Sequence, residues 1–375
     1  MTAAHHFFSY FPQFHPDPIN DRAWGAGFTD WDLIRALPES QRSRFTPRRG
    51  YYDPSTPDYL GSLCAQLEAL PLPHAGLMVY HYHFDGVGAL SGFEKQLLAQ
   101  PDKGPPFFLC WANETWTKRW VGKPGEVLIE QQHQLKPELV HAHARYLAQF
   151  FELPHYHRVD GRPLFILYNA QASVTLPRVI ALYREAFAEL GHEPLIGACI
   201  AYPHPPDQLQ PYDFGCEFEP RFFFNSQSPS SLAQMAARLK MNFPVLFEWL
   251  GAQRDRLRQR TGQRTFAYGD YLAALADGRL ERALRASTGT LPLMRSTFLS
   301  WDNLPRYGAR STSVTHDGVT PEALAALHTL RSDHGLPLLI NSWNEWSEGA
   351  ALEPGQQAHS LGADFFQALR LAQGH

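Results

Sequence analysis

The chain has 375 residues, a formal net charge of −4, 19% charged residues and 44% hydrophobic residues. A net negative charge argues against a protein that binds nucleic acid through phosphate contacts, which would carry a basic excess. The composition is typical of a packed globular protein rather than a disordered one. Aromatic residues make up 13%, with nine tryptophans, enough for a large core or for a cleft that stacks sugars.

The amino terminus and the cysteines bear on the cellular compartment. Residues 1–7 show no basic segment followed by an apolar one, so we expect no signal peptide, although processing would remove such a segment. No apolar run approaches the length of a membrane span. The four cysteines, Cys64, Cys110, Cys199 and Cys216, are widely spaced without a Cys-x-x-Cys pair. We therefore predict reduced core cysteines in a cytoplasmic protein.

Eight short apolar runs recur along the chain, and we predict a strand in each: 6–11, 76–82, 106–111, 164–168, 195–201, 212–218, 293–299 and 337–342. Segments with apolar spacing near three and four predict helices at 57–70, 137–151, 176–190, 321–334 and 363–373. This alternation predicts a (β/α)8 barrel formed by one domain, residues 1–375. No Gly-x-Gly-x-x-Gly turn follows the first run, which weakens a dinucleotide-binding alternative.

Two stretches interrupt the alternation. Residues 203–211 are short and rich in proline, so we predict a loop there. About seventy residues separate the sixth and seventh runs, and they carry helical patterns at 230–241, 247–260 and 268–285. We predict a helical insertion at 225–290 within the barrel domain, because both flanking runs belong to one series of repeats.

Catalytic groups of such barrels lie at the carboxyl ends of the strands and in the loops that follow. Here these positions hold polar and aromatic residues from at least seven of the eight runs. The substrate-binding residues that we predict are Tyr10, Gln13, His81, His83, Trp111, Asn113, Glu114, Tyr168, Glu217, Glu219, Trp301, Asp302, Asn344 and Trp346.

The segment 341–349, Asn-Ser-Trp-Asn-Glu-Trp-Ser-Glu-Gly, carries the clearest chemistry. Glycosidic bond chemistry needs one carboxyl group to protonate the leaving oxygen and a second to supply negative charge or to accept a proton. Glu345 and Glu348 provide this pair, and tryptophan rings beside them offer apolar faces to sugars. We therefore predict that Glu345 and Glu348 are the catalytic residues.

Several of the other residues have more than one interpretation. His81 and His83 project to one side of a strand and could bind sugar hydroxyls, which we favour, pack structurally or bind a metal; because further ligands are missing, we predict no metal and no cofactor. Glu114 could be a hydroxyl anchor, which we favour, a catalytic carboxylate or a helix-start charge. Glu217 and Glu219 could serve a substrate site or pair with Arg221. Helical histidines, including His141 and His143, are predicted to lie on the surface.

The chain resembles the glycoside hydrolase family 99-like proteins, and more specifically their WbsX-type branch, described as glycosyltransferases of bacterial surface-polysaccharide synthesis. The matching motifs run in order through nearly the whole chain: 10–16 (Tyr-Phe-Pro-Gln-Phe-His-Pro), 20–31, 80–82, 109–114, 127–131, 159–165, 301–303, 343–349 and 352–354. The chain departs from the pattern at His83, where a tryptophan is expected, and around 203–211 and 225–285. These departures leave the substrate open.

The resemblance implies a mechanism. Family 99 enzymes act on α-mannosidic linkages with retention through two glutamates in a Trp-Asn-Glu-Trp-x-Glu context. Carried onto this chain, Glu345 would take the proton of the sugar 2-hydroxyl, which attacks its own anomeric carbon to give a 1,2-anhydro sugar. Glu348 would protonate the leaving oxygen and then activate the incoming water or sugar. This division needs Glu345 ionised and Glu348 protonated near neutral pH.

Three functions follow as hypotheses. The first is a carbohydrate-active enzyme that cleaves or transfers an α-mannoside-like bond in a bacterial surface polysaccharide, with glycosidase chemistry. The second is a glycosyltransferase of O-antigen or lipopolysaccharide biosynthesis, for which Asp30-Trp31-Asp32 is only weak support as an Asp-x-Asp element. The third is a catalytically silent glycan-binding module. In each case the expected partner is an oligo- or polysaccharide, with no nucleic acid.

Overall fold

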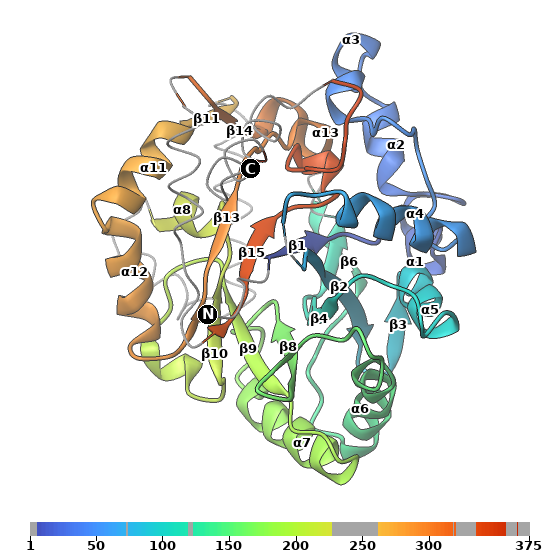
Figure 1. Ribbon diagram of the computed structural model, residues 1–375, viewed down its shortest axis with the longest axis vertical. Helices are drawn as coiled ribbons and strands as arrows, with labels where there is room; N and C mark the ends of the chain where they lie inside the picture. Colours follow the sequence, from blue (N-terminus) through green and yellow to red (C-terminus); the bar gives the residue numbers. More distant parts are fainter. Residues whose placement is uncertain are drawn as a thin grey trace.

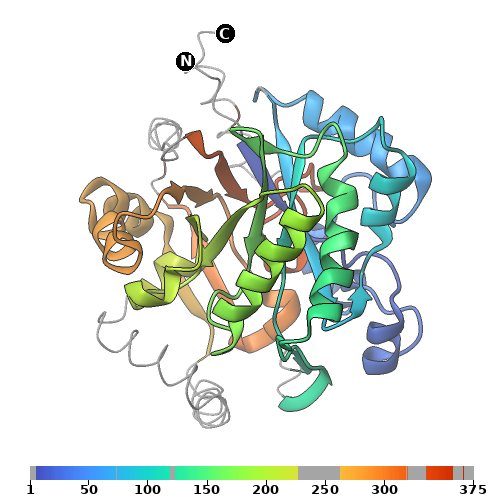
Figure 2. The same cartoon turned by 90° about the horizontal axis from the view of Figure 1, so that it is seen from below.

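The computed structural model describes residues 6–72, 74–118, 123–226, 262–317, 319, 335–357 and 366. At its centre, parallel strands form a barrel that helices surround on the outside (Figures 1 and 2). The barrel strands are β1 (His6–Tyr10), β2 (Gly76–Phe84), β4 (Phe107–Trp111), β8 (Arg162–Leu167), β9 (Leu195–Ile200), β10 (Phe214–Glu217), β12 (Leu293–Met294), β13 (Ser296–Phe298) and β15 (Leu338–Asn341).

Parallel pairing joins these strands into a ring. The order runs from β12 through β10, β9, β8, β4, β2, β1 and β15 to β13. Only Arg295 separates β12, which pairs with β10, from β13, which pairs with β15. The segment 293–298 therefore acts as one interrupted strand, the seventh of the eight barrel strands in chain order. The predicted (β/α)8 fold is confirmed, and every predicted strand overlaps a barrel strand.

Apolar side chains on both strand faces explain why this sheet lies inside the protein. Every residue of β1 and of β4 is buried, as expected for parallel strands that are covered on both faces. Side chains that point inward fill the barrel, and those that point outward pack under helices. The alternation along each strand consequently decides which side chains reach the barrel interior.

The main outer helices are α4 (Pro57–Glu68), α5 (Gly92–Ala99), α6 (Pro137–Phe151), α7 (Leu176–Glu189), α11 (Tyr268–Ala276) and α12 (Arg279–Thr288). Proline occupies the first turn of α4, α6 and α7, where its missing N–H costs no hydrogen bond. Helix α6 buries one face, which includes Val140, Ala144, Leu147 and Phe151 at a spacing of three to four residues. Figure 2 shows α6 and α7 side by side on the outside of the strands.

Shorter elements occupy the connections: α1 (Pro18–Trp24), α2 (Asp30–Arg35), α3 (Glu39–Arg42), η1 (Ser43–Phe45), β3 (Val87–Ala89), β5 (Trp116–Lys118), β6 (Lys123–Ile129), β7 (Arg158–Val159), η3 (Pro206–Leu209), α8 (Arg221–Ser226), β11 (Arg264–Ala267), α13 (Leu304–Tyr307), η4 (Gly308–Arg310), β14 (Thr312–Thr315) and η6 (Trp346–Glu348). Strands β11 and β14 form a separate parallel pair. The predicted loop at 203–211 contains the short helix η3.

The predicted helical insertion is described only in part. Residues 227–261, which include the predicted helices at 230–241 and 247–260, lie outside the described residues, as do the predicted helices at 321–334 and, apart from residue 366, 363–373. The pattern at 268–285 corresponds to α11 and α12, which a left-handed Gly278 separates. No helix in the described ranges is long and apolar enough to cross a membrane.

Gly76, the first residue of β2, allows a close approach that a larger residue would prevent. A Cβ atom there would lie 2.5 Å from Phe7 Cε1 and 2.5 Å from the Pro106 carbonyl oxygen. We expect Gly76→Ala to lower the free energy of unfolding by about 1–3 kcal/mol through overpacking. Gly61→Ala, in α4 where a Cβ meets nothing within 4 Å, is the matched control and should not destabilise. Urea unfolding of both variants measures the difference; equal stability would contradict the packing.

Candidate active site

The two predicted catalytic glutamates lie in a tight turn after β15. The Glu345 N–H donates to Ser342 Oγ at 2.9 Å, and the Glu348 N–H donates to the Glu345 carbonyl at 3.2 Å. Gly349 ends the turn with a left-handed φ of 60°, where a Cβ would lie 2.8 Å from the Asp302 backbone. The turn therefore packs directly on the loop that follows β13.

Arg306 of α13 joins the two glutamates. Its Nη1 lies 2.6 Å from Glu348 Oε1, and its Nη2 lies 3.2 Å from Glu345 Oε2. The same Nη2 lies 3.6 Å from Asp30 Oδ1, at the start of α2. All four side chains are buried, with Asp30 fully so. The Arg306 guanidinium thus forms ion pairs with three buried carboxyl groups.

A second arginine reaches this cluster from its open side. Arg221, which begins α8, places Nη2 3.4 Å from Glu348 Oε1, and its side chain is 42% exposed. Two guanidiniums therefore approach the same oxygen of Glu348. A proton carried by Glu348 would sit on the other oxygen, Oε2, because N–H donors occupy Oε1.

Burial dominates the electrostatics of the cluster. Burial raises the pKa of Glu345 to about 8. The positive charge of Arg306 opposes this rise, and the negative charges of Glu348 and Asp30 add to it. Burial likewise raises the pKa of Asp30 against the pull of Arg306. Burial acts to lower the pKa of Arg306, but the three carboxylates overcome it and the pKa is raised. A pKa of about 8 favours the protonated form of Glu345 at pH 7, whereas the mechanism that the resemblance implies uses the ionised form.

Aromatic residues of the barrel interior surround the acids. Tyr80 of β2 lies with its ring centroid 5.8 Å from Tyr168 and 6.5 Å from Phe11, whose own ring lies 5.0 Å from the Arg306 guanidinium carbon. Burial raises the pKa of Tyr80 and of Tyr82, and the charge of Glu345 adds to the effect on both. The interior thus presents rings and hydroxyl groups next to the carboxylates. Of these tyrosines only Tyr168 was predicted as a site residue.

The alternation along β2 places its histidines on the other face. His81 bonds to Glu94 of α5 at 2.9 Å and to His143 of α6 at 2.7 Å. His83 stacks on His143 at a centroid distance of 3.7 Å. Both predicted substrate-binding histidines therefore lie under the outer helices, away from the carboxylates. The prediction that His143 lies on the surface is wrong, because it is 1% exposed in this network.

The residues after β4 divide between structure and site. The Trp111 indole N–H donates to the His83 carbonyl at 2.8 Å on the outer face. Asn113 is fully buried and fastens the next loop, accepting from the Asn169 N–H at 2.7 Å. Glu114 is exposed. Burial raises the pKa of Tyr168; the charge of Arg221 opposes this rise, and the charge of Glu114 adds to it. Of the three, Glu114 is the residue whose charge acts on both Tyr168 and Arg221 beside the carboxylate cluster.

Glu217 and Glu219 also face outward. Glu217 Oε2 lies 3.3 Å from Arg295 Nε, and Glu219 Oε2 accepts from the Phe223 N–H at 2.9 Å. The hypothesis that they pair with Arg221 is wrong, because Arg221 turns to Glu348. Burial raises the pKa of both glutamates, and the charge of Glu217 adds to the rise at Glu219.

Four predicted residues lie around the ends of β1 and β15. Tyr10 packs against Phe93 of α5, with centroids 4.4 Å apart, rather than toward the acids. Asn344 clamps Phe11 by accepting from its N–H at 2.7 Å and donating to its carbonyl at 2.9 Å. The Trp346 indole N–H donates to Glu353 at 3.0 Å, and the Gln13 carbonyl accepts from the Asp30 N–H at 2.9 Å. These residues position the loop of the glutamates.

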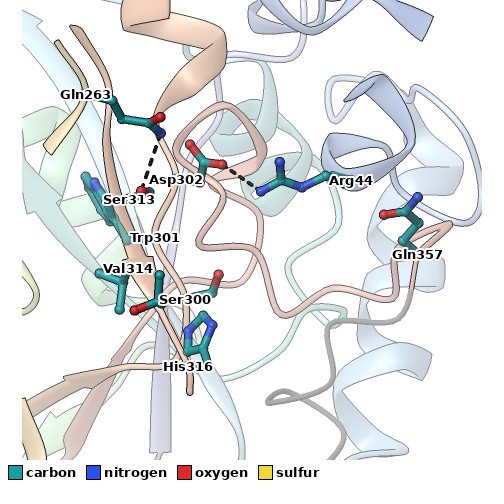
Figure 3. Close-up of a pocket in the computed structure, with 10 residues that line it drawn as sticks. Arg44, Gln263, Ser300, Trp301, Asp302, Ser313, Val314, His316 and Gln357 are labelled. Atoms are coloured by element: carbon teal, nitrogen blue, oxygen red, sulfur yellow. Dashed lines mark hydrogen bonds and ion pairs between the residues drawn. The ribbon is translucent and has the colours of Figure 1, made fainter. Parts of the chain in front are cut away.

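Trp301 and Asp302 lie beside the cluster. The Asp302 N–H donates to the Glu348 carbonyl at 2.8 Å, and the Asp302 carboxylate pairs with Arg44 at 2.7 Å (Figure 3). In the described part of the chain, no group of three or more His, Cys, Asp or Glu side chains is arranged to hold a metal ion.

Four residues that were not predicted as site residues complete the cluster: Arg306, Arg221, Tyr80 and Tyr82. Arg221 was named only as a possible partner of Glu217 and Glu219, and Tyr80 and Tyr82 only within a motif of the resemblance. For the tyrosines, the period of two along β2 was an available signal, since Tyr80 and Tyr82 share one face and His81 and His83 the other. Asp30 was noted only as part of an Asp-x-Asp element. The arginines had no comparable signal, because they lie in short helices whose orientation only the folded chain fixes.

Comparisons with known proteins agree with this architecture. The model of a family described as Glycosyltransferase WbsX matches residues 7–369. Two proteins of Xanthomonas campestris pv. campestris, both named uncharacterized protein WxcX, are similar over 97% of this chain, at 30% identity in strain B100 and 31% in strain ATCC 33913. The chain spans about half of their length, 48%.

Two solved structures share the fold. A protein described as glycoside hydrolase-like matches with a TM-score of 0.56 at 15% identity, covering 98% of this chain and 93% of that one. The GH99 endo-alpha-mannosidase from Bacteroides thetaiotaomicron, in complex with bis-tris-propane, matches with a TM-score of 0.51 at 14% identity, covering 99% and 96%. At such identities the likeness shows the barrel fold alone. From the family match over nearly its whole length, the chain belongs to the family described as Glycosyltransferase WbsX.

Proposed function

We propose that the chain is a retaining carbohydrate-active enzyme that cleaves or transfers an α-mannoside-like glycosidic bond of a bacterial surface polysaccharide. The observation that carries the proposal is the buried cluster in which Arg306 holds Glu345 and Glu348 together at the end of the barrel. Tyr80, Tyr82 and Tyr168 surround it with the rings and hydroxyls that sugars use. The fold shared with a GH99 endo-alpha-mannosidase supports the choice of bond.

In this proposal Glu345 is the base. Its pKa of about 8 suits proton transfer near neutral pH, because a base works best when its pKa lies close to the working pH. A sugar 2-hydroxyl placed against Glu345 would give its proton to Glu345 as its oxygen attacks the anomeric carbon. Glu345 would return this proton to the same oxygen when the 1,2-anhydro ring opens in the second step. Arg306 holds the Glu345 carboxylate at one oxygen, which fixes the orientation of the other.

Glu348 is the acid in the same proposal. With Oε1 held by Arg306 and Arg221, Oε2 is the oxygen that would present a proton to the departing sugar. After that sugar leaves, Glu348 would remove a proton from the incoming water or sugar hydroxyl, which opens the 1,2-anhydro ring with overall retention. The acceptor decides whether the reaction is hydrolysis or transfer.

A second candidate is transfer from a phosphorylated sugar donor. Two observations favour it: the family description as a glycosyltransferase, and the paired arginines Arg306 and Arg221 beside the acids. Guanidinium groups suit phosphate oxygens because their N–H groups form a planar fork. Incubation with nucleotide sugars, and separately with α-mannan and rhamnose-containing glycans, distinguishes the candidates by which substrate is consumed.

The two glutamates should differ in their response to the leaving group. We expect Glu348→Gln to lower turnover on the order of 10²–10⁴-fold with poor leaving groups and much less with activated aryl glycosides, which need little protonation. Glu345→Gln should impair both, because the 2-hydroxyl must be activated whatever departs. Steady-state rates with paired substrates, and circular dichroism to show intact folding, measure this. Turnover within a few-fold of the parent for either variant would refute its role, and turnover of a 2-deoxy substrate would refute the intramolecular step.

The pH profile should report Glu345. Because the base must be ionised and its pKa is about 8, kcat/KM should fall as pH decreases below about 8, by about tenfold per pH unit. Asp30→Asn should move this limb to lower pH, since the Asp30 charge raises the pKa of Glu345. Asp32→Asn, at an exposed carboxylate paired with Arg35, is the matched control and should leave the limb in place. A profile that stays flat from about pH 6 to about pH 9 would contradict the assignment.

Catalysis should not require a metal ion, since the proposed chemistry is carried by carboxyl groups alone. We expect full activity after dialysis against EDTA, with added Mg²⁺, Mn²⁺ or Zn²⁺ giving no increase. Activity that is lost in chelator and restored by one divalent cation would overturn this expectation.

A further inference from the structure

A cavity of about 410 Å³ lies behind the loop of Glu348. Its wall comes from the segment after β13, from β14, and from Gln263 just before β11, while Arg44 and Gln357 approach from the opposite side (Figure 3). The volume falls in the range of ligand sites in proteins, roughly 300–1,000 Å³.

The chemistry of the wall favours a neutral, hydroxyl-rich ligand. Among the described lining residues, Arg44 and Asp302 form an ion pair at 2.7 Å and so balance each other's charge. Gln263 and Gln357 add amide groups, and burial lowers the pKa of His316, which keeps that ring neutral at pH 7. Amides, hydroxyls and a balanced ion pair can both donate to and accept from sugar hydroxyls, whereas an anion would meet no unpaired cation among the lining residues that the structure describes.

Trp301 belongs to the buried part of the cavity wall. It is 4% exposed, and its ring packs against Phe224 of α8 with the ring centroids 6.1 Å apart. The lining also includes Ser300, Ser313 and Thr315, whose hydroxyl groups can donate to and accept from a sugar.

The cavity is also connected to the acids. The Asp302 N–H donates to the Glu348 carbonyl at 2.8 Å, and Asp302 Oδ1 accepts from the Leu304 N–H at 3.2 Å. Leu304 begins α13, the helix that carries Arg306. A ligand that contacts Asp302 therefore acts on a residue bonded both to the backbone of the proposed acid and to the helix of the central arginine.

We propose that this cavity binds a neutral saccharide unit next to the catalytic loop, an inference that rests on the proposed function. Such a unit would be either a part of the substrate chain remote from the reacting bond or a separate glycan. In the first case its binding free energy contributes to catalysis on long substrates and is absent with short ones.

The test is calorimetry on the full chain with neutral tetrasaccharides from α-mannan and from a rhamnose-containing glycan, and with inorganic phosphate. Thr315→Trp, which fills the cavity, and Gln263→Ala, which removes an amide, should raise the Kd of a tetrasaccharide, by about tenfold or more for the former. Gln149→Ala, at an exposed glutamine of α6, is the matched control and should bind like the parent. Thermal melts of all variants separate loss of binding from loss of fold.

A tetrasaccharide that binds the parent but not Thr315→Trp supports the proposal. Binding unchanged in both cavity variants, no binding of either tetrasaccharide at millimolar concentration, or binding of phosphate alone would each overturn it. The proposed function fails separately, if parent turnover is insensitive to Glu345→Gln and Glu348→Gln. Two kinetic measurements tell the two sources of the saccharide unit apart. If Thr315→Trp abolishes the gain in kcat/KM from disaccharide to tetrasaccharide substrates, the unit is part of the substrate. If free tetrasaccharide changes the rate on a short aryl glycoside in the parent but not in Thr315→Trp, the unit is a separate glycan.

Discussion

The end of the barrel depends on one buried guanidinium. Asp30 comes from the start of α2, and Glu345 and Glu348 come from the loop after β15, far away in the sequence; each acid would carry a large desolvation cost as an unpaired anion. Arg306 lies within 3.6 Å of all three. Its partners therefore fix the positions of α2, α13 and the loop after β15 relative to one another. Without the Arg306 cation, the buried acids could remain buried only in their protonated form. The positions of these side chains and the net charge of the site therefore depend on each other.

The surroundings of this cluster make its electrostatics strong. The rings of Tyr80, Tyr82 and Tyr168 pack around the acids in the barrel interior, and Coulomb interactions are stronger at a given distance where the dielectric constant is lower than that of water. The same burial that makes ionised Glu345 costly gives it a high proton affinity once it is ionised. Arg221 differs because its side chain remains 42% exposed, so it can exchange Glu348 for a ligand at a lower cost than Arg306 can.

The sequence predicted the barrel, which the structure confirms, and it pointed to Glu345 and Glu348, which the structure brings together, because both are local patterns. Apolar runs mark the strands, and Glu345 and Glu348 stand three residues apart in a distinctive segment. It failed where the outcome depended on which face of a strand points inward. His81 and His83 were predicted to bind substrate because histidine is a common site residue. The alternation of side chains along β2 instead directs them toward α5 and α6, and it directs Tyr80 and Tyr82 toward the site. The partners Glu217–Arg295 and Arg306–Glu348 join segments far apart in sequence, and no local pattern encodes such pairs.

Gly349 shows how closely two of these segments approach. With only a hydrogen on its Cα, the turn that follows Glu348 rests on the backbone of Asp302, where a methyl group would lie 2.8 Å from the Asp302 nitrogen and oxygen. Backbone atoms in such contact have no flexible side chain between them to absorb a displacement. The loop after β13 and the loop after β15 must therefore shift together. A displacement of either loop would be passed to the other through backbone contact, without any change of side-chain rotamer.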